Sequence, residues 1–104
     1  MENSFKTVSN FLTKCEEEGK DFYVSFCIAK IGVSIFYFNK ENYEIFASPK
    51  NGLISILQGN DSIDIRFYEE TKVSYYDYLA QEGVKVIRIY TDNSNNYIII
   101  GENV

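Results

Sequence analysis

The chain has 104 residues, of which 45% are hydrophobic and 16% aromatic, so we expect residues 1–104 to form a single globular domain rather than a disordered chain. Its formal charge of −5 and its pI of about 4.6 argue against direct binding to nucleic acid, because phosphate contacts need clustered Lys and Arg. The apolar runs are shorter than the ~20 residues of a membrane span and the first residues lack the pattern of a secretion signal, so we expect a cytoplasmic protein with no membrane partner.

The first predicted element is an amphipathic helix from about residue 5 to residue 18. Its apolar side chains recur at helical spacing, and they are Phe5, Val8, Leu12 and Cys15. We expect Ser4 to be the N-cap, because a serine hydroxyl can accept a hydrogen bond from a free N–H of the first turn. Gly19 is placed to end the helix.

After Asp21 the hydrophobic period changes from helical spacing to strict alternation, which predicts strands. Residues 22–29 and 33–38 are predicted to form an antiparallel hairpin. Because residues 33–38 have bulky side chains on both faces, this segment should be a central strand covered on both sides or a strand that meets a partner chain. A third strand is expected at 43–47, followed by a turn at 49–52.

The next segments are less uniform in pattern. Residues 53–57 fit either a short buried strand or one and a half helical turns, and we expect helix or irregular structure there. Residues 63–68 alternate cleanly and predict a strand with a polar outer face. Further strands are expected at 84–90 and at 97–100, on either side of a polar turn.

The tyrosine-rich segment before the last two strands has the end signals of a helix. Ser74 followed by Asp77 resembles a capping box, and Gly83 can stop a helix, so we expect a short second helix over 75–82. The strand preference of tyrosine leaves open a strand in which alternate tyrosines share a face. The predicted fold class is therefore α+β, with a mainly antiparallel sheet of about five to six strands and both helices packed on it.

The sequence offers little for catalysis. It contains no histidine, so the commonest general base and all Ser-His and Cys-His nucleophile arrangements are missing. Cys15 and Cys27 are too few for a tetrahedral metal site, and we expect them to be small buried hydrophobes, with a disulfide or a reactive thiol as the alternatives. We therefore expect no metal, no cofactor and no enzymatic activity. A carboxylate pair that includes Asp61 and Asp64 is the remaining enzymatic alternative.

The acidic residues are concentrated in residues 61–82. This segment contains six carboxylates and two basic side chains, whereas the rest of the chain is close to neutral. A tyrosine among carboxylates suits a protein partner, because it offers a large contact area and a polar tip at a low entropic cost. The residues that we expect to contact a partner are Asp64, Tyr68, Glu69, Glu70, Tyr75, Asp77, Tyr78 and Glu82. The alternative is a solvated acidic face without a binding role.

These patterns favour a small acidic protein-interaction module that binds a basic protein. One concrete version is an inhibitor or antagonist whose carboxylates mimic phosphates in the site of a nucleic-acid-binding protein. The abundance of Asn, Ile, Lys, Tyr and Phe indicates an AT-rich coding sequence, which suggests a mobile-element protein. The alternative function is a small-ligand sensor or regulatory domain, with a pocket between the sheet and a helix. A homodimer also stays open, because an apolar strand at an unprotected sheet edge would pair with a second copy.

Overall fold

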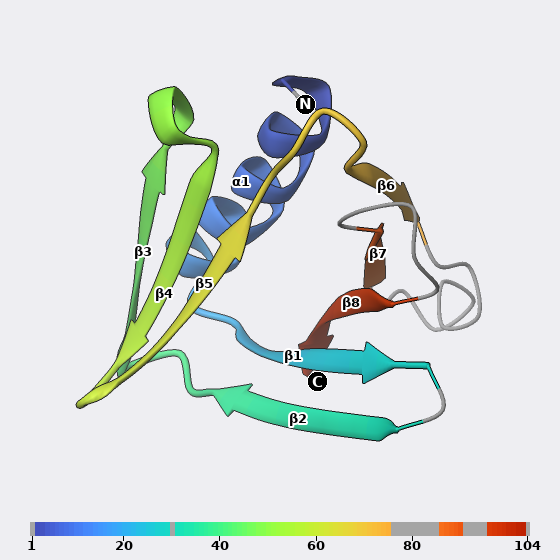
Figure 1. Cartoon of the computed structure of the whole chain (residues 1–104). Coiled ribbons are helices and arrows are strands. Elements are labelled where there is room, and N and C mark those ends of the chain that lie inside the picture. The colour runs from blue at the N-terminus through green and yellow to red at the C-terminus, as the bar shows by residue number, and fades with distance from the viewer. Residues whose placement is uncertain (1, 30, 76–85, 91–95, 104) are drawn as a thin grey trace.

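The computed structural model describes residues 2–29, 31–75, 86–90 and 96–103. Within these ranges the chain forms one α-helix and eight strands, which are arranged in two antiparallel sheets (Figure 1). The elements are α1 (Glu2–Glu17), β1 (Asp21–Ile28), β2 (Gly32–Phe38), β3 (Tyr43–Ser48), the 3-10 turn η1 (Pro49–Asn51), β4 (Leu53–Gln58), β5 (Asp61–Arg66), β6 (Lys72–Tyr75), β7 (Val86–Tyr90) and β8 (Tyr97–Asn103). The α+β class and the antiparallel pairing are as predicted, but the strands divide into two sheets.

Helix α1 confirms the first predicted element and its end. Gly19 has a positive φ of 63°, and the Lys20 N–H donates a hydrogen bond of 2.9 Å to the Cys15 carbonyl, which closes the helix as a glycine stop does. The prediction for Ser4 was wrong, because the helix begins at Glu2 and Ser4 lies inside it. The Ser4 hydroxyl instead donates to the Thr71 carbonyl at 2.9 Å, so it ties the helix to the segment before β6.

The larger sheet has the strand order β2-β1-β8-β7-β6, and each neighbouring pair is antiparallel. The predicted hairpin is confirmed, with Phe22 opposite Phe38 in its register. Strand β2 is an edge strand, which excludes the first alternative for residues 33–38, a central strand, while the second alternative, a strand that meets a partner chain, stays a prediction. Bulky residues on both faces do not tell an edge from a centre, because the sequence does not show which strands lie alongside.

The smaller sheet has the strand order β3-β4-β5. Its middle strand, β4, occupies residues 53–58, so the expected helix or irregular structure at 53–57 was wrong. Ile54 and Ile56 are fully buried on one side of β4, while Leu53 and Ser55 point to the other side. This alternation, together with pairing on both flanks, selects a strand for a run that is too short to decide by pattern alone.

One hydrophobic cluster joins α1 to both sheets. The apolar face of α1 lies between the sheets (Figure 1), and its residues Phe5, Val8, Leu12 and Cys15 are all buried. Cys27 is buried as well, and both cysteines are free thiols, as expected for small core residues. No helix among the described residues is long and apolar enough to cross a bilayer.

The predicted second helix is not present in the described part of the chain, where α1 is the only α-helix. Ser74 and Tyr75 lie in strand β6, where they are opposite Arg88 and Ile87, so Ser74 is not a helix cap. Residues 76–82 lie outside the described residues, as do residues 84–85 at the start of the predicted strand 84–90. The strand preference of Tyr75 and its pairing with β7 outweigh the capping signal at this position.

Candidate protein-binding face

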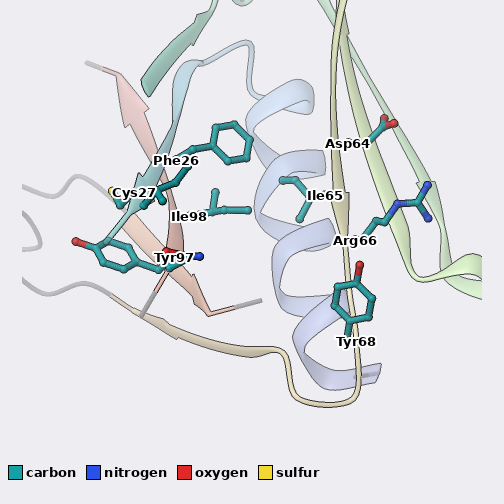
Figure 2. Close-up of a pocket in the computed structure, with 10 residues that line it drawn as sticks. Phe26, Cys27, Asp64, Ile65, Arg66, Tyr68, Tyr97 and Ile98 are labelled. Carbon is teal, nitrogen blue, oxygen red and sulfur yellow. The ribbon is translucent and has the colours of Figure 1, made fainter. Parts of the chain in front are cut away.

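The side of the three-stranded sheet that faces away from α1 forms a mixed apolar and charged surface, which we call the outer sheet face. Residues directly opposite in antiparallel strands share a face, so the registers of β3, β4 and β5 identify its members. They are Glu44, Phe46, Ser48, Leu53, Ser55, Leu57, Ser62, Asp64 and Arg66. Figure 2 shows Asp64 and Arg66 on the side of β5 opposite to Ile65 and α1.

An exposed phenylalanine lies on the outer sheet face. Phe46 is 54% exposed, although its strand neighbours Tyr43 and Ile45 pack into the core. On the adjacent strand, Leu53 and Leu57 are half-buried on the same face. A large aromatic side chain in an apolar setting, with charges around it, is typical of the energetically important centre of a protein interface.

The carboxylate of Asp64 is held in place on this face. Asp64 is exposed, and the hydroxyl of Ser55, its cross-strand neighbour, donates a hydrogen bond of 2.7 Å to Oδ1. This bond orients the carboxylate and leaves its other oxygen free to accept from a lysine or arginine of a partner. Glu44, on the outer edge of the same sheet, is also exposed.

Three further described acids of the segment 61–82 lie at the two ends of β5. Asp61 begins this strand, whereas Glu69 and Glu70 lie in the turn beyond its end, and roughly 20 Å of strand separates the two groups. All three are exposed, and within the described residues no Lys or Arg forms an ion pair with them or with Asp64. The acids therefore form a row rather than one compact cluster, and within it Asp61 lies on the side of β5 opposite to Asp64.

Tyr68 is an exposed aromatic side chain at the end of this row. It is 50% exposed, and its backbone N–H donates to the Thr71 hydroxyl at 2.8 Å. Thr71 is buried and accepts the Ser4 hydrogen bond through its carbonyl, so the turn that carries Tyr68 is attached to α1. A side chain on an attached turn loses less entropy on binding than one on a free loop.

The other predicted contact residues are not tested by this arrangement. Tyr75 lies in β6, and Asp77, Tyr78 and Glu82 lie outside the described residues. Sequence reasoning missed Phe46, Glu44 and Ser55. The alternation in residues 43–48 already indicates that Phe46 and Ile45 lie on different faces of their strand. The contact between Ser55 and Asp64 could not be predicted, because it depends on residues 53–58 being the middle strand of the sheet.

A groove of about 320 Å³ lies beside the free edge of β5, between that strand and the larger sheet. Its apolar floor comprises Phe26, Ile65 and Ile98, which converge over α1 in Figure 2. Asp64 and Arg66 point away from this floor in the same view. The groove therefore suits an apolar side chain or a small apolar ligand, and its floor brings no carboxylate pair together for acid–base chemistry.

Comparison of the chain with protein-family models, with curated proteins and with solved structures gives no match. In the part of the chain that the structure describes, no group of three or more His, Cys, Asp or Glu side chains could hold a metal ion.

Proposed function

We propose that this chain is a small protein-interaction module that binds a basic protein through the outer sheet face and the adjoining turn. The observation that carries the proposal is the exposed Phe46 on the same face as Asp64, whose carboxylate is oriented by Ser55. An aromatic centre supplies the desolvated contact, and the carboxylates around it supply charge complementarity. The net charge of −5 favours encounter with a positively charged partner.

The row of carboxylates along β5 supports the narrower proposal of an inhibitor or antagonist. A protein groove built for nucleic acid presents Lys and Arg along a line, because the phosphates that it binds are arranged along a strand. Asp64 and the pair Glu69 and Glu70 follow one another along β5 and the turn after it, beside an exposed tyrosine, which is a comparable linear arrangement. Occupation of such a groove would block nucleic-acid binding by the partner.

The test starts with affinity capture by the chain at low salt, followed by identification of the bound proteins and measurement of binding. Phe46→Ala should weaken the affinity for the captured partner about 10- to 30-fold, as expected for an interface hot spot. A double variant, Asp64→Lys with Glu70→Lys, should slow association and reduce its dependence on salt.

The matched control is Glu17→Lys, an exposed charge reversal on α1. It should leave the affinity nearly unchanged, because it lies on a different element from the outer sheet face. A captured partner that is not basic, or one whose binding survives Phe46→Ala, would contradict the proposal.

The groove supports a second candidate function, a small-ligand sensor or regulatory domain. Its volume of about 320 Å³ lies at the lower end of the range of ligand pockets, and its floor is apolar. In a thermal-shift screen, a ligand at 100 times its dissociation constant should add about 2.7 kcal/mol of stability. Stabilisation that persists in Phe46→Ala and is lost in Phe26→Ala would favour this function over the protein-binding face.

A further inference from the structure

Strand β2 is an edge strand of the larger sheet, and near its end the Tyr37 carbonyl accepts a hydrogen bond of 3.1 Å from the Gln58 side-chain amide. The strand pairs with β1 on one side, and among the described strands none pairs with its other side (Figure 1). Its residues 32–38 include no charged residue and no proline. Large apolar side chains on this strand and on the preceding hairpin loop are exposed, namely Ile31 (81%), Val33 (60%), Ile35 (49%), Phe36 (47%) and Tyr37 (58%).

An edge of this kind is unusual for a protein that stays monomeric. Natural edge strands are normally protected from further pairing by lysines, prolines, bulges or a covering element. Val33, Ile35 and Tyr37 share one face of β2, where they present on the order of 300 Å² of apolar surface, a size at which patches on small proteins are often functional. The exposed edge and the exposed side chains therefore point to strand pairing with another chain.

We propose that β2 pairs with β2 of a second copy of this chain, antiparallel across a two-fold axis, so that two five-stranded sheets become one continuous sheet. The midpoint of β2 is Ile35, and an axis there pairs the whole strand. Ile35 then faces its own copy, and Val33 of one copy faces Tyr37 of the other. Smaller side chains thus lie opposite larger ones, which is a self-complementary arrangement.

The chemistry of the strand favours a second copy over a charged partner. Each chain carries a net charge of −5, yet β2 contributes none of it, so this edge is where two copies can meet without bringing carboxylates together. Edge pairing covers the strand backbones fully and the flanking side chains only in part, because these side chains project from the faces of the sheet, so the contact falls below the ~1,200 Å² of small specific interfaces and predicts weak association.

This proposal goes beyond the protein-binding function and uses a different sheet. The outer sheet face is formed by β3, β4 and β5, whereas the dimer contact is formed by β2. A dimer would therefore present two partner-binding faces, and either contact can be removed without the other.

The oligomeric state tests the proposal directly. The full chain has a mass of 12.1 kDa, and sedimentation velocity should show a concentration-dependent dimer of twice that mass. Concentrations from about 1 to 500 µM cover the micromolar dissociation constants expected for a small interface. A chain that stays monomeric up to the highest concentration would overturn the proposal.

Charge variants at Ile35 then test the two-fold geometry. Ile35→Lys and Ile35→Glu each place two like charges opposite one another, so each should weaken dimerisation about 100-fold, while an equimolar mixture of the two should associate again. Circular dichroism on each variant verifies the fold. The matched control, Phe46→Lys, should dimerise like the natural chain. Dimerisation that survives Ile35→Lys, or that fails to return in the mixture, would be evidence against this pairing.

A cysteine at the same position reports the register. Opposite residues in antiparallel strands lie about 4.5–5.5 Å apart between Cα atoms, within the range that a disulfide spans. Ile35→Cys should therefore form a disulfide-linked dimer on mild oxidation, whereas Phe46→Cys should not. Cys15 and Cys27 are buried and provide a low background. Equal cross-linking of the two variants would refute the register.

Discussion

Gly101 and Tyr23 provide a quantitative test of the larger sheet. The two residues are opposite one another in β8 and β1, and the ring of Tyr23 lies over Gly101. A Cβ added at Gly101 would lie 2.5 Å from the Tyr23 Oη and 2.6 Å from Cζ, which is far closer than carbon and oxygen atoms approach in proteins. The Gly101→Ala variant must therefore displace the tyrosine ring.

The size of the effect follows from two opposing terms. A displaced Tyr23 ring loses part of its van der Waals contacts. Overpacking of this kind destabilises a protein by about 1–3 kcal/mol. Replacement of a strand glycine by alanine also stabilises the folded state by about 0.5–1 kcal/mol, because it reduces the conformational entropy of the unfolded chain. Gly101→Ala should therefore lower the free energy of unfolding by about 1–2 kcal/mol, or lower Tm by roughly 4–15 °C for a domain of this size.

A double-mutant cycle with Tyr23→Ala isolates the contact. Without the ring, the three atoms nearest to the new methyl group are gone, so the loss from Gly101→Ala should be smaller by about 1 kcal/mol or more in that background. Urea unfolding followed by circular dichroism measures all four chains. Gly59→Ala is a suitable control, because this glycine has a φ of 61° and no atom near its added Cβ, so its cost should be the same in both backgrounds. An equal loss from Gly101→Ala with and without the Tyr23 ring would refute the reasoning.

Two further predictions concern the core and the response to pH. Leu12→Ala, at a fully buried position of α1, should lower the free energy of unfolding by about 2–5 kcal/mol in urea titrations, and a loss below 1 kcal/mol would contradict the packing. Tyr43 donates a hydrogen bond of 2.8 Å to the Lys20 carbonyl, and burial raises the pKa of its hydroxyl from 10.0 to about 12. Its contribution to stability is therefore complete below pH 10 and is lost as pH rises toward 12, because the unfolded chain ionises first. Tyr43→Phe should lower the free energy of unfolding by about 1 kcal/mol at pH 8. Between pH 10 and 12 the free energy of unfolding of this variant should fall less steeply than that of the natural chain. An equally steep fall in both chains would show that another group titrates in this range.

The sequence was sufficient for most of the secondary structure, because hydrophobic periodicity is a local property. The helical spacing from Phe5 to Cys15 and the alternation after Asp21 both correspond to real elements. Residues 53–57 were misassigned because five residues hold too few repeats to separate the two periods, and only the flanking strands β3 and β5 make the segment a strand. Ser4 was misassigned because the helix begins at Glu2, and the Ser4 hydroxyl instead donates to the Thr71 carbonyl, a contact across 67 residues of sequence.

The candidate site was only partly predictable for a related reason. Asp64 and Tyr68 were found because they lie in an acidic stretch that composition reveals. Phe46 lies elsewhere in the sequence and reaches the same face through the order β3-β4-β5, which no local pattern specifies. The division into two sheets could not be predicted for the same reason. The loop between β2 and β3 has no sequence feature that distinguishes a connection between two sheets from a turn within one sheet.

The place of β8 between β1 and β7 affects how the molecule is made. Asp21 is opposite Asn103, so one flank of an early strand stays open until the ribosome has delivered nearly all of the described sequence. Contacts this distant along the chain slow folding, and β-rich domains rich in them fold in milliseconds to seconds. The nascent polypeptide would meanwhile display an apolar strand that is paired on one flank only, which is the kind of surface that molecular chaperones bind during synthesis.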